Sequence, residues 1–170
     1  MFGVGDDGRV LQLWRADDDS PWRGHVFANG WRLSPDEPMT AVVFDAHIGE
    51  DGLDRDHVHH RPPSRAIGVV PLANGHELRQ NLNQGAEWQP HSRHVVTMTL
   101  PPRTRHRDLA AAGLVSATSG HDLGADNWDV ANLTITFQGP EGADTLVQGC
   151  GAPIARFGRD RHEWVVPVAR

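Results

Sequence analysis

Two stretches of this sequence are rich in the oxygen-bearing side chains that hard divalent cations bind. One runs from Glu50 to Asp56 and the other from Asp122 to Asp129. Calcium takes about six to eight oxygen ligands, and Asp and Asn side chains in loops supply them without a helix. The candidate calcium ligands are Glu50, Asp51, Asp54, Asp56, Asp122, Asp126, Asn127 and Asp129. The alternative is an Asx turn at Asp126 and Asn127 that only begins the following strand.

A histidine cluster next to the first acidic stretch suggests a second metal chemistry. His57, His59 and His60 lie within four residues. On a strand, His57 and His59 point the same way, as a pair of zinc ligands requires. No third ligand follows at a suitable spacing, and the 11 histidines of the chain make chance clusters common. Zinc is therefore the weaker alternative to calcium.

Tryptophans provide a different kind of contact. An indole ring can stack on a sugar or insert at a membrane interface, and it can equally anchor a loop in the core. Trp128 stands beside Asn127 in the second acidic stretch, and we expect Trp14 and Trp22 to lie in a short, partly exposed N-terminal segment. These four residues are the candidate ligand contacts. For Trp128 the role of core anchor stays open, and Trp88 should pack inside.

Catalytic motifs are lacking in the sequence. It contains no nucleophile elbow, phosphate-binding loop or His-Glu-x-x-His zinc motif. Ser92 lies between His91 and His94, but neighbouring side chains on a strand face opposite ways. The single cysteine, Cys150, is flanked by glycines and suggests a turn. We expect no enzymatic activity; a metal-dependent hydrolase is the less favoured alternative.

Charge and hydropathy restrict the partners. A net charge of -6 argues against nucleic acid, which needs a basic footprint, and we interpret Arg103–Arg107 as a solvated turn. No window approaches 18 apolar residues, so we expect no transmembrane helix. The first eight residues have neither a basic region nor an apolar run, so no signal peptide is expected in this chain.

The elements that position these side chains are expected to be β-strands. Apolar and polar residues alternate in 40–48, 94–100, 130–137 and 163–168, and shorter strands are expected at 10–14, 24–28, 66–72, 114–118 and 145–148. One dry and one wet face on each strand predicts antiparallel sheets packed together. Pro71 and Pro167 should lie on edge strands or at strand ends. A single helical turn is expected over Asp108–Gly113, which begins with an acid and ends with glycine.

The predicted fold class is an all-β antiparallel sandwich of about eight strands with an N-terminal β-hairpin extension. The prolines and acids of Leu33–Pro38 suit an exposed connector. We therefore expect an N-terminal β extension over residues 1–38 and the sandwich over residues 39–170.

Six short motifs occur in a fixed order between Val42 and Phe137. They are Gly49–Arg55, Asn74-Gly75, Asn83–Trp88, Val95–Pro101, Asp108-Leu109 with the strand from Leu114, and Gly124–Asp129. Together they resemble the PLAT β-sandwich, named for polycystin, lipoxygenase and alpha-toxin, in a branch found in bacterial secreted proteins. The pattern departs from the family at Gly52, at the histidine extension and at Ala125, where a glycine is usual.

The resemblance implies a non-catalytic binding module of a secreted or surface protein. Its expected ligand is carbohydrate or a membrane lipid surface, recognised with calcium held between the two acidic loops. The alternative is a metal-independent protein-interaction or assembly domain whose acidic loops are solvated turns.

Overall fold

Strands make up nearly all the regular structure in a computed structural model that describes residues 2–4, 10–14, 23–28, 33–53, 64–117, 127–150, 153–158 and 162–168. The elements are β1 (Phe2–Val4), β2 (Val10–Trp14), β3 (Arg23–Ala28), β4 (Ala41–Ile48), β5 (Arg65–Pro71), β6 (Glu77–Asn81), β7 (Arg93–Thr99), the 3-10 turn η1 (His106–Asp108), β8 (Ala111–Ala117), β9 (Trp128–Gly139), β10 (Gly142–Cys150), β11 (Ala155–Phe157) and β12 (Glu163–Pro167).

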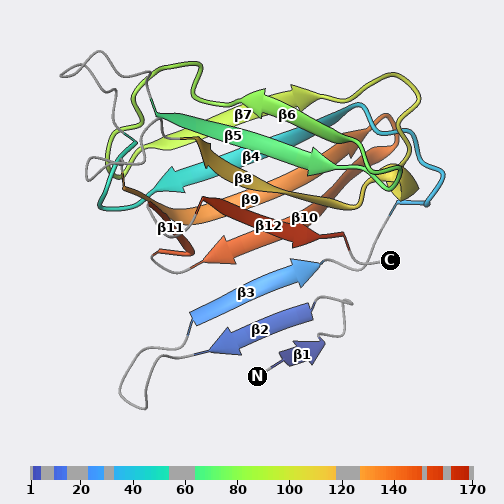
Figure 1. Cartoon of the computed structure of the whole chain (residues 1–170). Helices are drawn as coiled ribbons and strands as arrows, with labels where there is room; N and C mark the ends of the chain where they lie inside the picture. The colour runs from blue at the N-terminus through green and yellow to red at the C-terminus, as the bar shows by residue number, and fades with distance from the viewer. Residues whose placement is uncertain are drawn as a thin grey trace.

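Two antiparallel sheets face each other (Figure 1). The larger has eight strands, in the order β1-β2-β3-β10-β9-β4-β7, with β11 paired to one end of β9. The smaller has four, in the order β12-β8-β5-β6. This confirms the all-β antiparallel sandwich that the alternating patterns predict.

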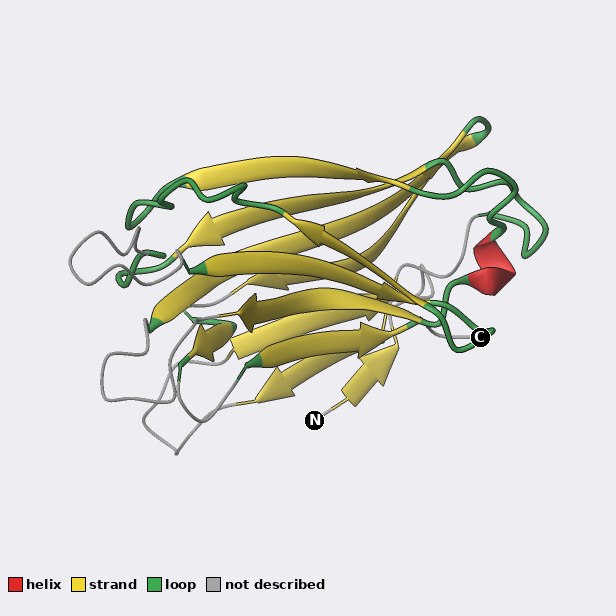
Figure 2. Cartoon of the chain, turned by 45° about the horizontal axis from the view of Figure 1, so that its top comes forward, coloured by secondary structure: helices red, strands yellow, loops and turns green. Residues whose placement is uncertain are grey.

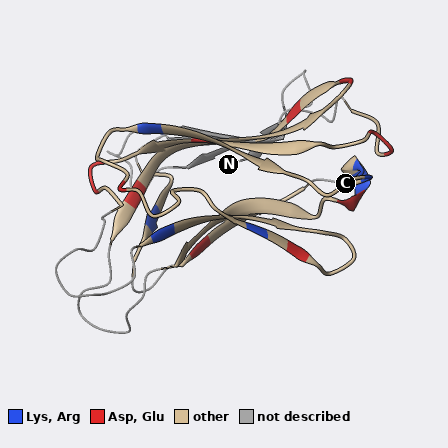
Figure 3. Ribbon diagram, turned by 90° about the horizontal axis from the view of Figure 1, so that it is seen from above, with Lys and Arg blue, Asp and Glu red and all other residues tan. Residues whose placement is uncertain are grey.

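The alternation places the core between the sheets. In β4, Val42, Phe44, Ala46 and Ile48 are buried, while the intervening residues are half-buried or exposed. The same pattern occurs along the second half of β9, whose Leu133, Ile135 and Phe137 face inward. Charged residues gather at the rims and ends of the two layers (Figure 3).

The expected helical turn over Asp108–Gly113 is wrong. The short turn η1 ends at Asp108, and the small residues from Ala111 onward form β8, between β12 and β5. A Cβ on Gly113 would lie 2.1 Å from the carbonyl oxygen of Trp164 on β12. Six residues are too few to hold a helix alone, so the close strand pairing that small residues permit decides the structure.

The prolines lie where the sequence places them, because Pro71 is the last residue of β5 and Pro167 the last of β12. Three strands were not expected: β1, β6 and β11. β1 and β11 have three residues each, and β6 contains only one apolar residue, Leu78. None of them carries enough alternation to be recognised.

The N-terminal strands extend the larger sheet. β3 pairs with β10, with Val26 opposite Gln148, and β2 and β1 follow outward. Backbone hydrogen bonding is therefore continuous across the boundary expected near residue 38. The described part of the chain contains no helix of the length and hydropathy needed to cross a membrane.

Candidate functional site

The two acidic stretches meet at one end of the sandwich, which we call the acidic end (Gly49–Leu53 and Asn127–Asp129). β4 and β9 are neighbours, so the loop after β4 runs beside the start of β9. The Gly49 N–H donates to the Asp129 carbonyl at 2.8 Å, and the Asp129 N–H donates to the Asp51 carbonyl at 2.9 Å. Asp51 and Asp129, far apart in sequence, thus become neighbours.

A cation already lies between these carboxylates. Arg156 is opposite Asp129 in the β11–β9 pairing, and its guanidinium contacts Asp51 Oδ2 at 3.0 Å and Asp129 Oδ1 at 3.4 Å. Sequence reasoning missed Arg156 because β11 is so short. Ala155-Arg-Phe157 places one charged residue outward between two buried ones, but three alternating residues are too few to predict a strand.

The electrostatics of Asp129 show that its carboxylate is poorly compensated. Burial raises the pKa of Asp129; Arg156 opposes this shift, and Asp51 and Glu50 add to it. Asp129 is only 5% exposed, and its Oδ1 is buried without a hydrogen-bond partner. The contact with Arg156 is an ion pair by distance and not an aligned hydrogen bond. One buried acceptor is therefore available to a better-placed cation or donor.

The side chain of Trp128 lies in the core at the acidic end and not on its surface. Its assignment as a ligand contact is therefore wrong. Its side chain is 0% exposed, it stacks on Phe157 at 4.5 Å between ring centroids, and its Nε1 donates to Ser116 Oγ at 2.9 Å. Trp88 meets it edge-on at 6.1 Å. The indole anchors the loop in the core, the alternative left open above, and Trp88 packs as expected.

A β-bulge explains why Trp128 turns inward. Odd-numbered residues face the core from Leu133 to Phe137, yet the buried apolar residues at the start of β9 are the even-numbered Trp128 and Val130. The β4–β9 register shifts between His47 and Ile48, which reverses the inward side of β9. Strict alternation would have directed Trp128 outward with Thr134 and Thr136.

Ser92 and His94 lie on the same side of the chain, two residues apart at the start of β7. Ser92 Oγ and His94 Nε2 are 2.7 Å apart. The Ser92 hydroxyl donates to the Gln89 carbonyl, so His94 Nε2 must be the donor to Ser92. His94 also stacks on Trp88 at 4.5 Å, and burial lowers its pKa. In this hydrogen-bond network the histidine does not receive the hydroxyl proton, as a catalytic base would.

The other predicted site residues divide into two groups. Asn127 is exposed, and its Oδ1 lies 2.2 Å from where a Cβ on Gly158 would stand. Glu50 is exposed beside Asp51. Trp14 lies at the end of β2. The rest lie outside the described residues: Trp22, Asp54, Asp56, His57, His59, His60, Asp122 and Asp126. Within the described ranges, no three His, Cys, Asp or Glu side chains form a metal-binding group.

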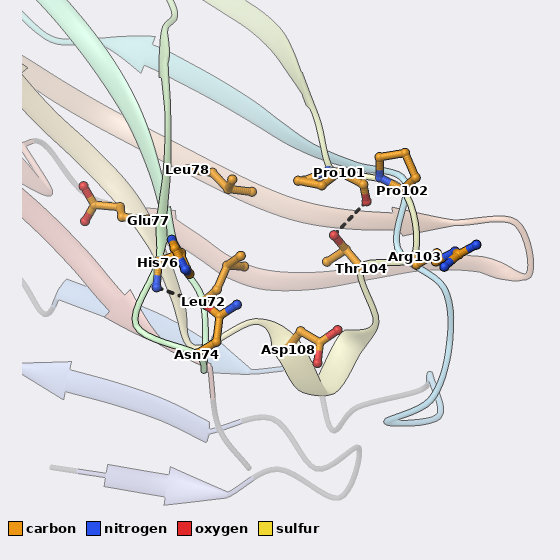
Figure 4. Close-up of a pocket in the computed structure, with 10 residues that line it drawn as sticks. All are labelled: Leu72, Asn74, His76, Glu77, Leu78, Pro101, Pro102, Arg103, Thr104 and Asp108. Carbon is orange, nitrogen blue, oxygen red and sulfur yellow. Dashed lines mark hydrogen bonds between the residues drawn. The ribbon is translucent and has the colours of Figure 1, made fainter.

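We call the opposite end of the sandwich, where η1 lies (Figure 2), the cavity end (residues 72–78 and 101–108). It contains a cavity of about 470 Å³ (Figure 4). Its lining residues are Leu72, Asn74, His76, Glu77, Leu78, Pro101, Pro102, Arg103, Thr104 and Asp108. Thr104 Oγ1 donates to the Pro101 carbonyl at 2.8 Å, and Arg103 has a φ of 71°. Sequence reasoning missed this cavity because turns far apart in the sequence assemble it, and no one turn indicates the others.

The arginines next to the cavity form an exposed turn, as expected. Arg105 and Arg107 both pair with Asp36, with Arg105 Nη1 at 3.4 Å from its carboxylate. The Arg105 N–H donates to Asp108 Oδ2 at 2.8 Å. Nearby carboxylates therefore balance much of this local positive charge.

Comparison with solved structures supports the fold. The chain is similar to the alpha toxin from Clostridium absonum, with a TM-score of 0.52 and 9% identity, over 83% of this chain and 34% of that one. The chain thus spans about a third of the toxin's length. Alpha-toxin is one of the proteins for which the PLAT sandwich is named, so the likeness agrees with the expected sandwich and, at this identity, concerns the fold alone. No protein-family model and no curated protein matches the sequence.

Proposed function

We propose that this chain is a non-catalytic binding module that recognises carbohydrate or a membrane surface through calcium held at the acidic end. The observation that carries the proposal is the buried Asp129 Oδ1, which lies beside Asp51 and accepts no hydrogen bond. An oxygen of a buried carboxylate that accepts no hydrogen bond is costly, and a hard cation is a suitable partner for it.

In this proposal the Arg156 guanidinium occupies the position between the two carboxylates when no calcium is bound. Its side chain is 59% exposed, so the guanidinium can swing into solvent when a stronger cation arrives. Asp51 and Asp129 supply only part of the oxygen set that calcium needs, so further donors would come from the predicted ligands in the adjoining loops. The bound ion would then offer open positions to ligand hydroxyl or phosphate oxygens. We propose a secreted or surface location on the PLAT resemblance alone.

The first test is a thermal melt in EDTA, in millimolar calcium and in millimolar zinc. Calcium alone should raise the melting temperature, since ligand at about 100 times its dissociation constant stabilises the native state by roughly 2.7 kcal/mol. D129N should abolish the calcium shift. R156Q should enlarge it, because the competing guanidinium is gone.

R93Q is the matched control. Arg93 and Asp45 form a further Arg–Asp pair on the larger sheet, with Arg93 Nε donating to Asp45 Oδ1 at 2.8 Å. Its loss should leave the calcium shift unchanged. If neither the wild type nor R156Q responds to calcium, the metal proposal fails. A response to zinc alone transfers the site to His57, His59 and His60.

The ligand class is then separated by two binding assays. One uses vesicles of phosphatidylcholine with and without phosphatidylserine, and the other a panel of insoluble polysaccharides, each in calcium and in EDTA. Calcium-dependent retention on one support identifies the source of the ligand oxygens. No retention on either, with a clear calcium shift, limits calcium to a structural role.

A further inference from the structure

The β7 edge of the larger sheet differs from the two edges of the smaller sheet. β7 pairs with β4 on one side, and no described strand pairs with its other side. The N–H of Leu100 donates to Thr40 and the N–H of Ile48 to Ser92, so even-numbered residues of β7 face β4. The N–H and C=O groups of Arg93, Val95, Thr97 and Thr99 therefore point to the open edge.

The side chains of β7 do not prevent another strand from pairing with this edge. Val95 is large and apolar and yet 57% exposed, and Thr97 and Thr99 are exposed and neutral. Arg93 is neutralised by Asp45, with Nη2 2.6 Å from Oδ2. Strand edges are usually protected by charge, proline or bulges, and a neutral, regular edge is a template for pairing with another strand.

The edges of the smaller sheet carry such protection. β6 presents Glu77 and Arg79, paired at 3.0 Å, and β12 ends in Pro167. On β7 the one obstacle among the described residues is Gln80, whose Nε2 donates to the Thr97 carbonyl at 3.2 Å. A carbonyl oxygen has a second lone pair, so this bond does not prevent a further donor from binding.

We propose that β7 pairs antiparallel with β7 of a second copy of this chain, about a two-fold axis at Val95. In that register the two Val95 residues exchange N–H···O bonds, and Arg93 of each copy stands opposite Thr97 of the other. A register centred on Arg93 would set two arginines opposite each other, and one centred on Thr97 would set Arg93 opposite Pro101, which has no N–H. The larger sheets of the two copies then form one continuous sheet.

Light scattering after size exclusion tests the pairing. The wild type should elute with twice the 18.7 kDa mass of the chain, in EDTA as in calcium, which separates this proposal from the calcium proposal. V95K should be monomeric, because like charges would face each other across the axis. V95T, which keeps the β-branched shape, should remain dimeric. A monomeric wild type at about 100 µM, or a dimeric V95K, overturns the proposal.

Cross-linking tests the register. In a C150A background, V95C should form a disulfide-linked dimer on oxidation, since paired Cα atoms at about 5.5 Å lie within disulfide range. T99C is the control: four residues from the axis, its copies lie roughly 25 Å apart at about 3.3 Å per residue. Efficient cross-linking of the T99C variant and not of the V95C variant would overturn the proposed register.

Discussion

The two ends of the sandwich use similar residue types in opposite ways. At the acidic end the large side chains of Trp128 and Leu53 point inward and are buried, as is the neighbouring Trp88. At the cavity end the turn residues stand around an open space, over half-buried Leu72 and Leu78. Substitutions should therefore change stability at the first end and leave it nearly unchanged at the second.

The largest contrast is expected between two apolar truncations. W128A removes a fully buried indole, its stack on Phe157 and its bond to Ser116, so we expect a loss of about 3–5 kcal/mol in the free energy of unfolding. L72A at the cavity end should cost about 1 kcal/mol, because Leu72 is half-buried. Urea denaturation measures both. S116A isolates the hydrogen bond, and equal losses at the two ends would refute the contrast.

Two asparagines give a matched polar comparison. Asn83 is buried and its side chain bonds the backbone of Ala66, Ser64 and Ala86 at 3.2, 2.9 and 2.8 Å. Asn74 is exposed and accepts one bond from the His76 N–H at 3.0 Å. N83A should therefore cost about 1–3 kcal/mol and N74A less than about 0.5 kcal/mol. The difference in melting temperature between the two variants checks this, and a reversed order would contradict it.

His94, which stacks on Trp88 beside the acidic end, should make the stability of the fold depend on pH. Burial lowers the pKa of His94, so the folded state prefers the neutral ring. The stabilisation is then present above pH 6.5 and is lost as the pH falls through the folded value. Burial likewise lowers the pKa of His106 at the cavity end, against the charge of Asp144. H94Q should thus remove part of the loss of stability that occurs as the pH falls below 6.5.

Asp129 should show the opposite sign. Because its folded pKa is raised, its contribution is full below pH 3.8 and is lost as the pH rises through the folded value. D129N should remove this loss, whereas H94Q should not affect it. Melting curves at closely spaced pH values separate the two, and a profile unchanged in both variants would contradict both shifts.

The smallest effect is expected at the turn beside the cavity. Arg103 has a positive φ, which costs a residue with a side chain up to about 1 kcal/mol and which glycine adopts freely. Glycine also gives the unfolded chain more freedom, so R103G should change stability by less than about 0.5 kcal/mol. R103A is the control for loss of the side chain. A loss above about 1 kcal/mol in R103G would mean that Arg103 fastens this end after all.

The local alternation of apolar and polar residues predicted the strands of the sheets well. Contacts between segments far apart in the sequence decided the features that this alternation could not predict. The alternation in β4 and β7 was enough to assign their faces, because side chains on a strand repeat every two residues. The bulge in β9 breaks that repeat between Asn132 and Val130, so the inward turn of Trp128 could not be read from spacing. The helix expected at Asp108–Gly113 failed for a similar reason, since strand neighbours decided it.

The sequence predicts that the two acidic stretches lie close together, whereas the calcium ligands stay a prediction. The meeting of Asp51 with Asp129 was anticipated because loops at one end of a sandwich approach each other. Arg156 was not, since nothing in the sequence pairs β11 with the start of β9. The residues that carry the family resemblance include Asn83, Trp88 and Trp128, all buried. Motif residues of this kind predict how loops are anchored in the core better than they predict which ligand the loops bind.

The strand order of the larger sheet has a consequence for synthesis. β3 pairs with β10 and β4 pairs with β9, with Ala41 opposite Gln138. Neither β3 nor β4 can pair with both of its neighbouring strands until the last third of the chain has been synthesised. Such distant pairings make folding slow, on the order of milliseconds to seconds. During synthesis β3 and β4 therefore lack one pairing partner each. The β9–β10 hairpin is a local unit that can form first, and β3 and β4 can then pair with it.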